Sequence, residues 1–161
     1  MNATAYADQS WFVMPLKPKS KEPAKFLRHG YLDATLDKQK IQDWFADPNT
    51  NIGIGLAQSS LVVLDFDFRN CKGNRKFYEL LERCFASNTY VVRTADGYHC
   101  YYYTEPHHKN FKGKLIDGID IKHRGYVVAA PSIHPSGVTY EVVNNVAAQV
   151  LPDDLAKVMM W

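Results

Sequence analysis

The sequence predicts an α+β fold, of the mixed α/β kind, with a central mixed or antiparallel sheet flanked by helices. Two observations predict this fold class. In the first half of the chain, short apolar runs of strand type alternate with segments of helical periodicity. In the second half, strand-type runs follow one another across short turns, which is typical of hairpins. This order differs from the regular strand–helix–strand repeat of a doubly wound parallel sheet.

Composition narrows the class of protein. A length of 161 residues with 46% hydrophobic residues suits one domain with a real core, and we expect a single domain over residues 1–161. The net charge of +2 excludes a histone-like polycation, so any contact with nucleic acid must come from a local basic surface. No apolar run approaches the roughly 20 residues that span a bilayer, and the N-terminus does not resemble a signal peptide.

The cysteines favour a cytoplasmic protein. Cys71, Cys84 and Cys100 are odd in number and lack the close spacing of a zinc site. We therefore expect free thiols, mostly in the core, and a cytoplasmic location without membrane attachment.

The first third of the chain contains two strand patterns and one helix pattern. An apolar run at 11–14 ends at Pro15 and is followed by a lysine- and proline-rich segment that we expect to be an exposed loop. Asp37 can cap a helix that runs to Ala46. In residues 51–56, Gly53 and Gly55 alternate with apolar residues, which indicates a strand approached closely by another backbone or by a ligand.

Residues 61–68, LVVLDFDF, form the most informative stretch. Four apolar residues run into Asp65 and Asp67, and the alternation of a strand places both carboxylates on one face. Two carboxylates about 7 Å apart on one strand face repel each other unless a cation lies between them. Hard divalent ions such as Mg²⁺ or Mn²⁺ prefer such oxygen ligands. When the pair is considered alone, a solvated strand end is the alternative interpretation.

The rest of the chain predicts a helix, a hairpin and further strands. Apolar residues recur at helical spacing in the segment 75–85, at Phe77, Leu80, Leu81, Cys84 and Phe85. Strands at 89–93 and 98–104 flank a turn, and His99 shares a face of the second strand with Tyr101 and Tyr103, for which we expect core positions. His107 and His108 follow in a loop, where we expect exposure rather than metal binding.

Asp120 lies between two isoleucines in a strand pattern at 115–121. If its face of the strand is the face of Asp65 and Asp67, three carboxylates surround one point. A strand at 125–130 follows, and residues 138–143 are expected to pair back on it as the final strand. Pro152 and the acidic residues after it cap a short terminal helix.

Five stretches in this order resemble the bifunctional DNA primase/polymerase (Prim-Pol) domain of the archaeo-eukaryotic primase superfamily, which is common in mobile elements. They are PLKPKSKEP, NIGIGL, LVVLDFD, VVRTADGYHCYYY and GIDIKHRGYVVAAPSIHPSG, and they cover the chain from about Trp11 to about Val143. The resemblance implies an archaeo-eukaryotic primase-like catalytic core. It also implies that Asp65, Asp67 and Asp120 are catalytic acids that bind two ions of Mg²⁺ or Mn²⁺.

The same resemblance implies a nucleotide site. His99 matches the histidine that contacts the phosphates of the incoming nucleotide. Six further matches rank below it: Lys122, Ser132 and His134 in the downstream stretch, and Asn51, Gly53 and Gly55 near the base or sugar. The chain departs from the family pattern in two turns. Asp96-Gly97-Tyr98 replaces a Ser-Gly-Gly turn, and Ala130-Pro131-Ser132 replaces Pro-Pro-Ser.

The function expected from this resemblance is template-dependent nucleotidyl transfer by a DNA primase, a DNA polymerase or both. Two metal ions would assist attack of a 3′-hydroxyl on a bound dNTP or NTP. The implied partners are a single-stranded DNA template or primer–template and a helicase, either as a further domain or as a separate replicative helicase. Two alternative functions stay open: a DxD metal enzyme such as a nuclease, and a non-catalytic module that binds nucleic acid or nucleotides with the same fold.

Overall fold

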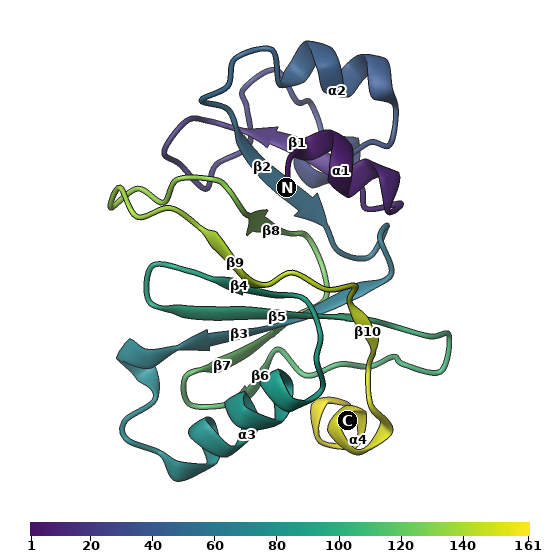
Figure 1. The fold of residues 1–161 in the computed structure, drawn as a ribbon. Coiled ribbons are helices and arrows are strands. Elements are labelled where there is room, and N and C mark those ends of the chain that lie inside the picture. The colour runs from purple at the N-terminus through teal and green to yellow at the C-terminus, as the bar shows by residue number, and fades with distance from the viewer. The chain divides into compact units, whose positions relative to one another are not determined.

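A computed structural model describes residues 1–161, which form two compact units (Figure 1). The first unit comprises Met1–Ser59 and Arg124–Glu141, and the second comprises Ser60–His123 and Val142–Trp161. The chain therefore leaves the first unit after Ser59 and returns to it for a short stretch. Four α-helices and ten strands, almost all paired antiparallel, confirm the predicted α+β class.

The first unit is built on a three-stranded antiparallel sheet in the order β1-β2-β8. Its elements are α1 (Ala3–Asp8), β1 (Val13–Leu16), the 3₁₀-helix η1 (Gly30–Asp33), α2 (Lys38–Trp44), β2 (Asn51–Gly55) and β8 (Tyr126–Ala129). Asp37 caps α2 as predicted, because its side chain accepts a hydrogen bond from the N–H of Lys40. Tyr6 stacks on Trp11, and both rings are buried.

The second unit is built on a larger sheet in the order β6-β7-β3-β5-β4-β9, with β10 added beside β5. Its elements are β3 (Leu61–Asp67), the 3₁₀-helix η2 (Phe68–Asn70), α3 (Arg75–Ala86), β4 (Val91–Arg93), β5 (Gly97–Tyr103), β6 (Lys114–Ile116), β7 (Ile119–Lys122), β9 (Glu141–Asn144), β10 (Gln149–Val150) and α4 (Asp153–Met159). The first residue of β9, Glu141, is counted with the first unit. The predicted strand with two aspartates, β3, has neighbours on both sides.

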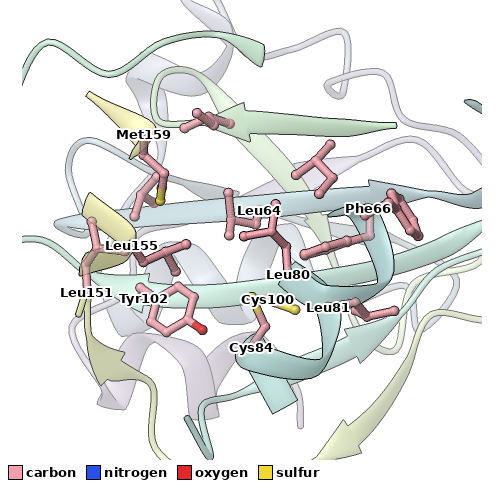
Figure 2. Packing of buried hydrophobic residues seen from close by; sticks show 14 of the residues in the cluster. Leu64, Phe66, Leu80, Leu81, Cys84, Cys100, Tyr102, Leu151, Leu155 and Met159 are labelled. Atoms are coloured by element: carbon pink, nitrogen blue, oxygen red, sulfur yellow. The ribbon is translucent and has the colours of Figure 1, made fainter. Parts of the chain in front are cut away.

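One face of this sheet carries the core of the second unit. Leu64 and Phe66 of β3 point to the same side as Cys100 and Tyr102 of β5, toward α3 and α4 (Figure 2). Side chains of α3 at the predicted helical spacing cover this face, namely Phe77, Leu80, Leu81 and Cys84. Phe85 departs from the prediction, since it is 39% exposed. The alternation of β3 therefore directs its aspartates to the opposite face.

Phe77 is expected to be a large contributor to stability. Its side chain is fully buried and its ring contacts Phe66 and Phe68 at 5.4 Å between centroids. Replacement by alanine should cost about 3–5 kcal/mol of unfolding free energy, because it leaves a cavity between α3 and the sheet. Urea unfolding measures this cost. Phe85→Ala, on the exposed side of the same helix, is the control, and an equal loss for both variants would contradict the assignment of the core.

Two predicted strands differ in the structure. Residues 115–121 are a hairpin and not one strand, because Asp117 and Gly118 make a turn between β6 and β7 and Gly118 adopts a φ of +89°. Residues 138–143 do not return to the preceding strand. Instead β9 joins the larger sheet beside β4, while β8 lies in the three-stranded sheet.

The three cysteines are free and buried, as the sequence predicted. Tyr101 is fully buried, as predicted, whereas Tyr103 is partly exposed. None of the helices is long and apolar enough to cross a membrane.

Candidate active site

Asp65 lies at the centre of a group of polar residues on the larger sheet. In the β3–β5 pair Asp65 is directly opposite His99, and in the β3–β7 pair it is directly opposite Asp120. Directly opposite residues of antiparallel strands place their side chains on the same face, with Cβ atoms about 5 Å apart. Asp67 follows two residues later on that same face. Three adjacent strands therefore bring three acids and one histidine to neighbouring positions.

This register follows from the hydrophobic pattern of β3. A shift by one residue would move Leu64 and Phe66 out of the core and bury the two aspartates instead. The burial of apolar residues on one face thus determines where the carboxylates lie on the other.

Asp65 is partly buried and lies beside His99. Its side chain is 29% exposed, and the Nε2 atom of His99 lies 3.6 Å from its Oδ1. Burial by itself would raise the pKa of Asp65, but the attraction of His99, with a smaller contribution from Lys122, outweighs burial and lowers that pKa. Asp65 is thereby kept as a carboxylate, which is the form that binds a cation.

The pKa of Asp65 should rise when His99 is replaced by glutamine, because the desolvation of the carboxyl remains and its main attraction is lost. Carboxyl ¹³C chemical shifts followed through acid titration measure this pKa. Because the pKa of Asp65 is lower in the folded chain than in the unfolded chain, ionised Asp65 stabilises the wild-type fold at pH values above the ordinary carboxyl pKa. This stabilisation is lost as the pH falls through the lowered pKa. The pKa of Asp67, lowered chiefly by Arg69, serves as the internal control. An unchanged pKa of Asp65 would contradict the role given to His99.

Asp67 has different surroundings from Asp65. Its carboxylate accepts hydrogen bonds from Arg69 and from Asn70, which lie in η2 immediately after β3. These bonds, first of all that of the Arg69 side chain, lower the pKa of Asp67. The guanidinium of Arg69 also lies 3.3 Å from the carboxylate of Asp96 in the β4–β5 turn.

Asp120 and Lys122 lie two residues apart on β7 and share a face. The Nζ atom of Lys122 is 3.8 Å from Oδ2 of Asp120, and the two side chains are 43% and 52% exposed. Asp120 is therefore the most accessible of the three acids, with a cationic group beside it.

The five other residues of the predicted nucleotide site belong to the first unit. The side chain of Asn51 donates to the carbonyl groups of Ile133 and Ser20 and accepts from the N–H of Ile133. The hydroxyl of Ser132 accepts from the N–H of Ile52 at 2.8 Å. These bonds fasten the segment after β8 to the start of β2, so both side chains have a structural role.

Packing against Met14 accounts for Gly53, whereas at Gly55 the nearest atom is the end of a flexible side chain. A Cβ atom at Gly53 would lie 2.8 Å from Met14, and one at Gly55 would lie 2.8 Å from Gln58. His134 contacts the hydroxyl of Ser136 through Nδ1 in the turn that follows. The nucleotide roles of all five residues stay predictions.

Asn51 and Ser132 also line a cavity of about 290 Å³ in the first unit. Phe45, Pro48 and Ile133 supply apolar parts of its wall. Its volume is at the lower end of the range for small-molecule pockets.

A second group of possible metal ligands contains none of these three acids. His107, His108 and Asp153 bring ligand atoms within 4.8 Å of one another. His108 is buried, contrary to the prediction of an exposed pair. Its Nδ1 accepts a hydrogen bond from the N–H of Glu105, so the neutral ring carries its proton on Nε2 and offers no free lone pair to a metal. We leave this group outside the proposed site.

A comparison with protein-family models identifies the family of the chain. The model of the family "Bifunctional DNA primase/polymerase, N-terminal" matches residues 3–156, almost the whole chain. The chain belongs to the Prim-Pol family. A search of the curated proteins found no match. Membership assigns the chain, at the level of the family, to nucleotidyltransferases of the DNA primase/polymerase type. The substrates of this family are nucleotides and nucleic acid. Its members typically depend on divalent metals.

The sequence offered Arg69 only as one of many basic residues that could contact a template, and its contacts with Asp67 and Asp96 were not predicted. Its position, two residues after the aspartate that ends β3, is compatible with a local turn in which Asp67 accepts from the backbone N–H of Arg69. That pattern could have indicated the contact. The additional contact with Asp96 depends on the pairing of β3 with β5 and has no local signal.

Proposed function

We propose that this Prim-Pol chain is a template-dependent nucleotidyltransferase that joins dNTPs or NTPs on a single-stranded DNA template, as a primase, a polymerase or both. The register that sets Asp65 opposite both Asp120 and His99 carries the proposal. Nucleotidyl transfer needs several carboxylates and a phosphate-binding donor within a few ångströms of one point. The polar face of the second unit offers this combination.

The donor set fits Mg²⁺ or Mn²⁺. Asp65, Asp67 and Asp120 offer only oxygen ligands, which hard divalent ions prefer, and no cysteine accompanies them on that face. These three acids would hold two ions. When bound, divalent ions supply Lewis acidity that favours attack by a 3′-hydroxyl and offsets the charge of a triphosphate.

The protein groups bind and orient the substrate. His99, held against Asp65, would donate to a phosphate oxygen of the incoming nucleotide. Lys122 would add a positive charge at the same face, where the developing negative charge of the phosphates needs compensation. In the first unit, we propose contacts of Asn51, Gly53 and Gly55 with the base or sugar and of Ser132 and His134 with the rest of the nucleotide. We also propose that residues 1–161 are a single catalytic domain and that a helicase is a further partner.

Incubation with a single-stranded template, dNTPs and NTPs, and Mg²⁺ or Mn²⁺, with and without a primer, tests this function. The proposal predicts products longer than the primer, or new strands without one, that require template and disappear when the metal is chelated. Shortening of the template would instead identify a metal-dependent nuclease. Binding of template without any product under every metal and nucleotide condition would identify a non-catalytic module and overturn the proposal.

A further inference from the structure

Asp67 differs from the other two acids because its carboxylate is already fully engaged. Oδ1 accepts from the backbone N–H of Arg69 at 2.9 Å and from Nε of Arg69 at 3.1 Å. Oδ2 accepts from Nη2 of Arg69 at 2.8 Å and from Nδ2 of Asn70 at 3.1 Å. A carboxylate has about four lone-pair positions. All of them are occupied, so Asp67 can bind a cation only if one of these donors leaves.

The other two acids have longer contacts with side-chain donors than Asp67 has. Nε2 of His99 lies 3.6 Å from Oδ1 of Asp65, and Nζ of Lys122 lies 3.8 Å from Oδ2 of Asp120. Both distances exceed those of ordinary hydrogen bonds. A cation therefore meets the strongest competition from protein donors at Asp67.

Arg69 is the donor most able to leave. Its side chain is 66% exposed, so it has room to move, and its guanidinium already lies between two carboxylates. Nε is 3.1 Å from Oδ1 of Asp67 and 3.3 Å from Oδ2 of Asp96. The backbone keeps Asp96 in place, because its carbonyl accepts from the N–H of Phe68 at 2.9 Å. A guanidinium that releases Asp67 would keep a negatively charged partner within reach.

We propose that Arg69 is a positioning residue that exchanges between Asp67 and Asp96. Without a divalent cation it holds the carboxylate of Asp67 in a fork of two hydrogen bonds. When a cation takes an oxygen of Asp67, the guanidinium transfers to Asp96. Arg69 therefore lowers the affinity of the site for divalent cations. Asp96 makes this decrease in affinity smaller, because it gives the displaced guanidinium a second partner. This inference rests on the proposed function, since it takes the three acids as the metal site.

Binding of Mn²⁺ alone, measured from the free-ion electron paramagnetic resonance signal, tests the inference without turnover. Arg69→Met should bind Mn²⁺ roughly two- to fivefold more tightly than the wild type, the size expected for loss of an exposed ion pair. Arg69→Lys keeps the charge but lacks the fork, and it should also bind more tightly. Lys72→Met is the matched control, because Lys72 is an exposed cation of the same loop that pairs with Asp117. It should change the affinity less than twofold.

A double-mutant cycle separates exchange from simple charge effects. Asp96→Asn should weaken Mn²⁺ binding roughly twofold or more when Arg69 is present and should have no effect in the Arg69→Met background. If Asp96 acts on the ion only through its charge, its replacement has the same effect in both backgrounds. Equal effects would overturn the exchange.

The same experiment distinguishes a failure of the Arg69 inference from a failure of the proposed function. If Asp65→Asn abolishes Mn²⁺ binding but Arg69→Met and Arg69→Lys bind like the wild type, the metal site stands and the role of Arg69 is wrong. If the wild type binds no Mn²⁺, or Asp65→Asn binds it equally well, the three acids are not the metal site and both proposals fall.

Discussion

Replacement of Asp65 by asparagine is expected to lower the rate of template-dependent nucleotide addition on the order of 10³-fold, the scale seen when one preorganised electrostatic partner of a transition state is removed. Asp65 is opposite Asp120 on one side and His99 on the other, so the change acts at the centre of the group. Asparagine has nearly the same shape but no charge, and the side chain is already largely enclosed. The fold should therefore survive, and primer extension under single-turnover conditions measures the loss.

Asp117→Asn is the matched control for Asp65→Asn. Asp117 is a carboxylate of the same unit, but it lies in the β6–β7 turn and pairs with Lys72 and Lys114. Its replacement should leave nucleotide addition unchanged. Equal rates for Asp65→Asn and the wild type, with both proteins folded by circular dichroism, would remove Asp65 from the catalytic group.

Replacement of Gly97 by alanine is expected to destabilise the second unit by about 3 kcal/mol or more. A Cβ atom at Gly97 would lie 1.7 Å from the carbonyl oxygen of Phe66, which is part of the neighbouring backbone. Gly97 pairs with Asp67. An added methyl group would therefore force β3 and β5 apart at the position of Asp67. Urea unfolding measures the loss of stability.

Gly113→Ala is the control for Gly97→Ala. Gly113 has no atom within 4 Å of an added Cβ and no positive φ, so alanine should change stability by no more than about 0.5 kcal/mol. A wild-type unfolding midpoint for Gly97→Ala would mean that the two strands are farther apart than their pairing indicates.

The sequence was informative where burial on one side determines the structure. The apolar alternation of β3 and the helical spacing of α3 predict the core, and the same alternation predicts that Asp65 and Asp67 share the polar face. The cap at Asp37 was also predictable, because capping is local to the helix that it begins.

Other features were not predictable from local patterns. The β6–β7 hairpin was missed because a turn of two residues, Asp117 and Gly118, interrupts an otherwise continuous strand pattern. The pairing of β9 with β4 depends on contacts between distant parts of the chain. For the same reason the clamp between Asn51 and Ile133, which gives Asn51 a structural role, has no local signal.

The central claim is that Asp65, Asp67 and Asp120 catalyse nucleotide addition directed by a template. A set of primer–templates that differ only in the first unpaired template base tests it most directly. The account predicts that the nucleotide joined to the primer changes with that base, that addition is lost in Asp120→Asn, and that it persists in Asp117→Asn. Addition that ignores the template base, or that proceeds equally well in Asp120→Asn, would contradict the account.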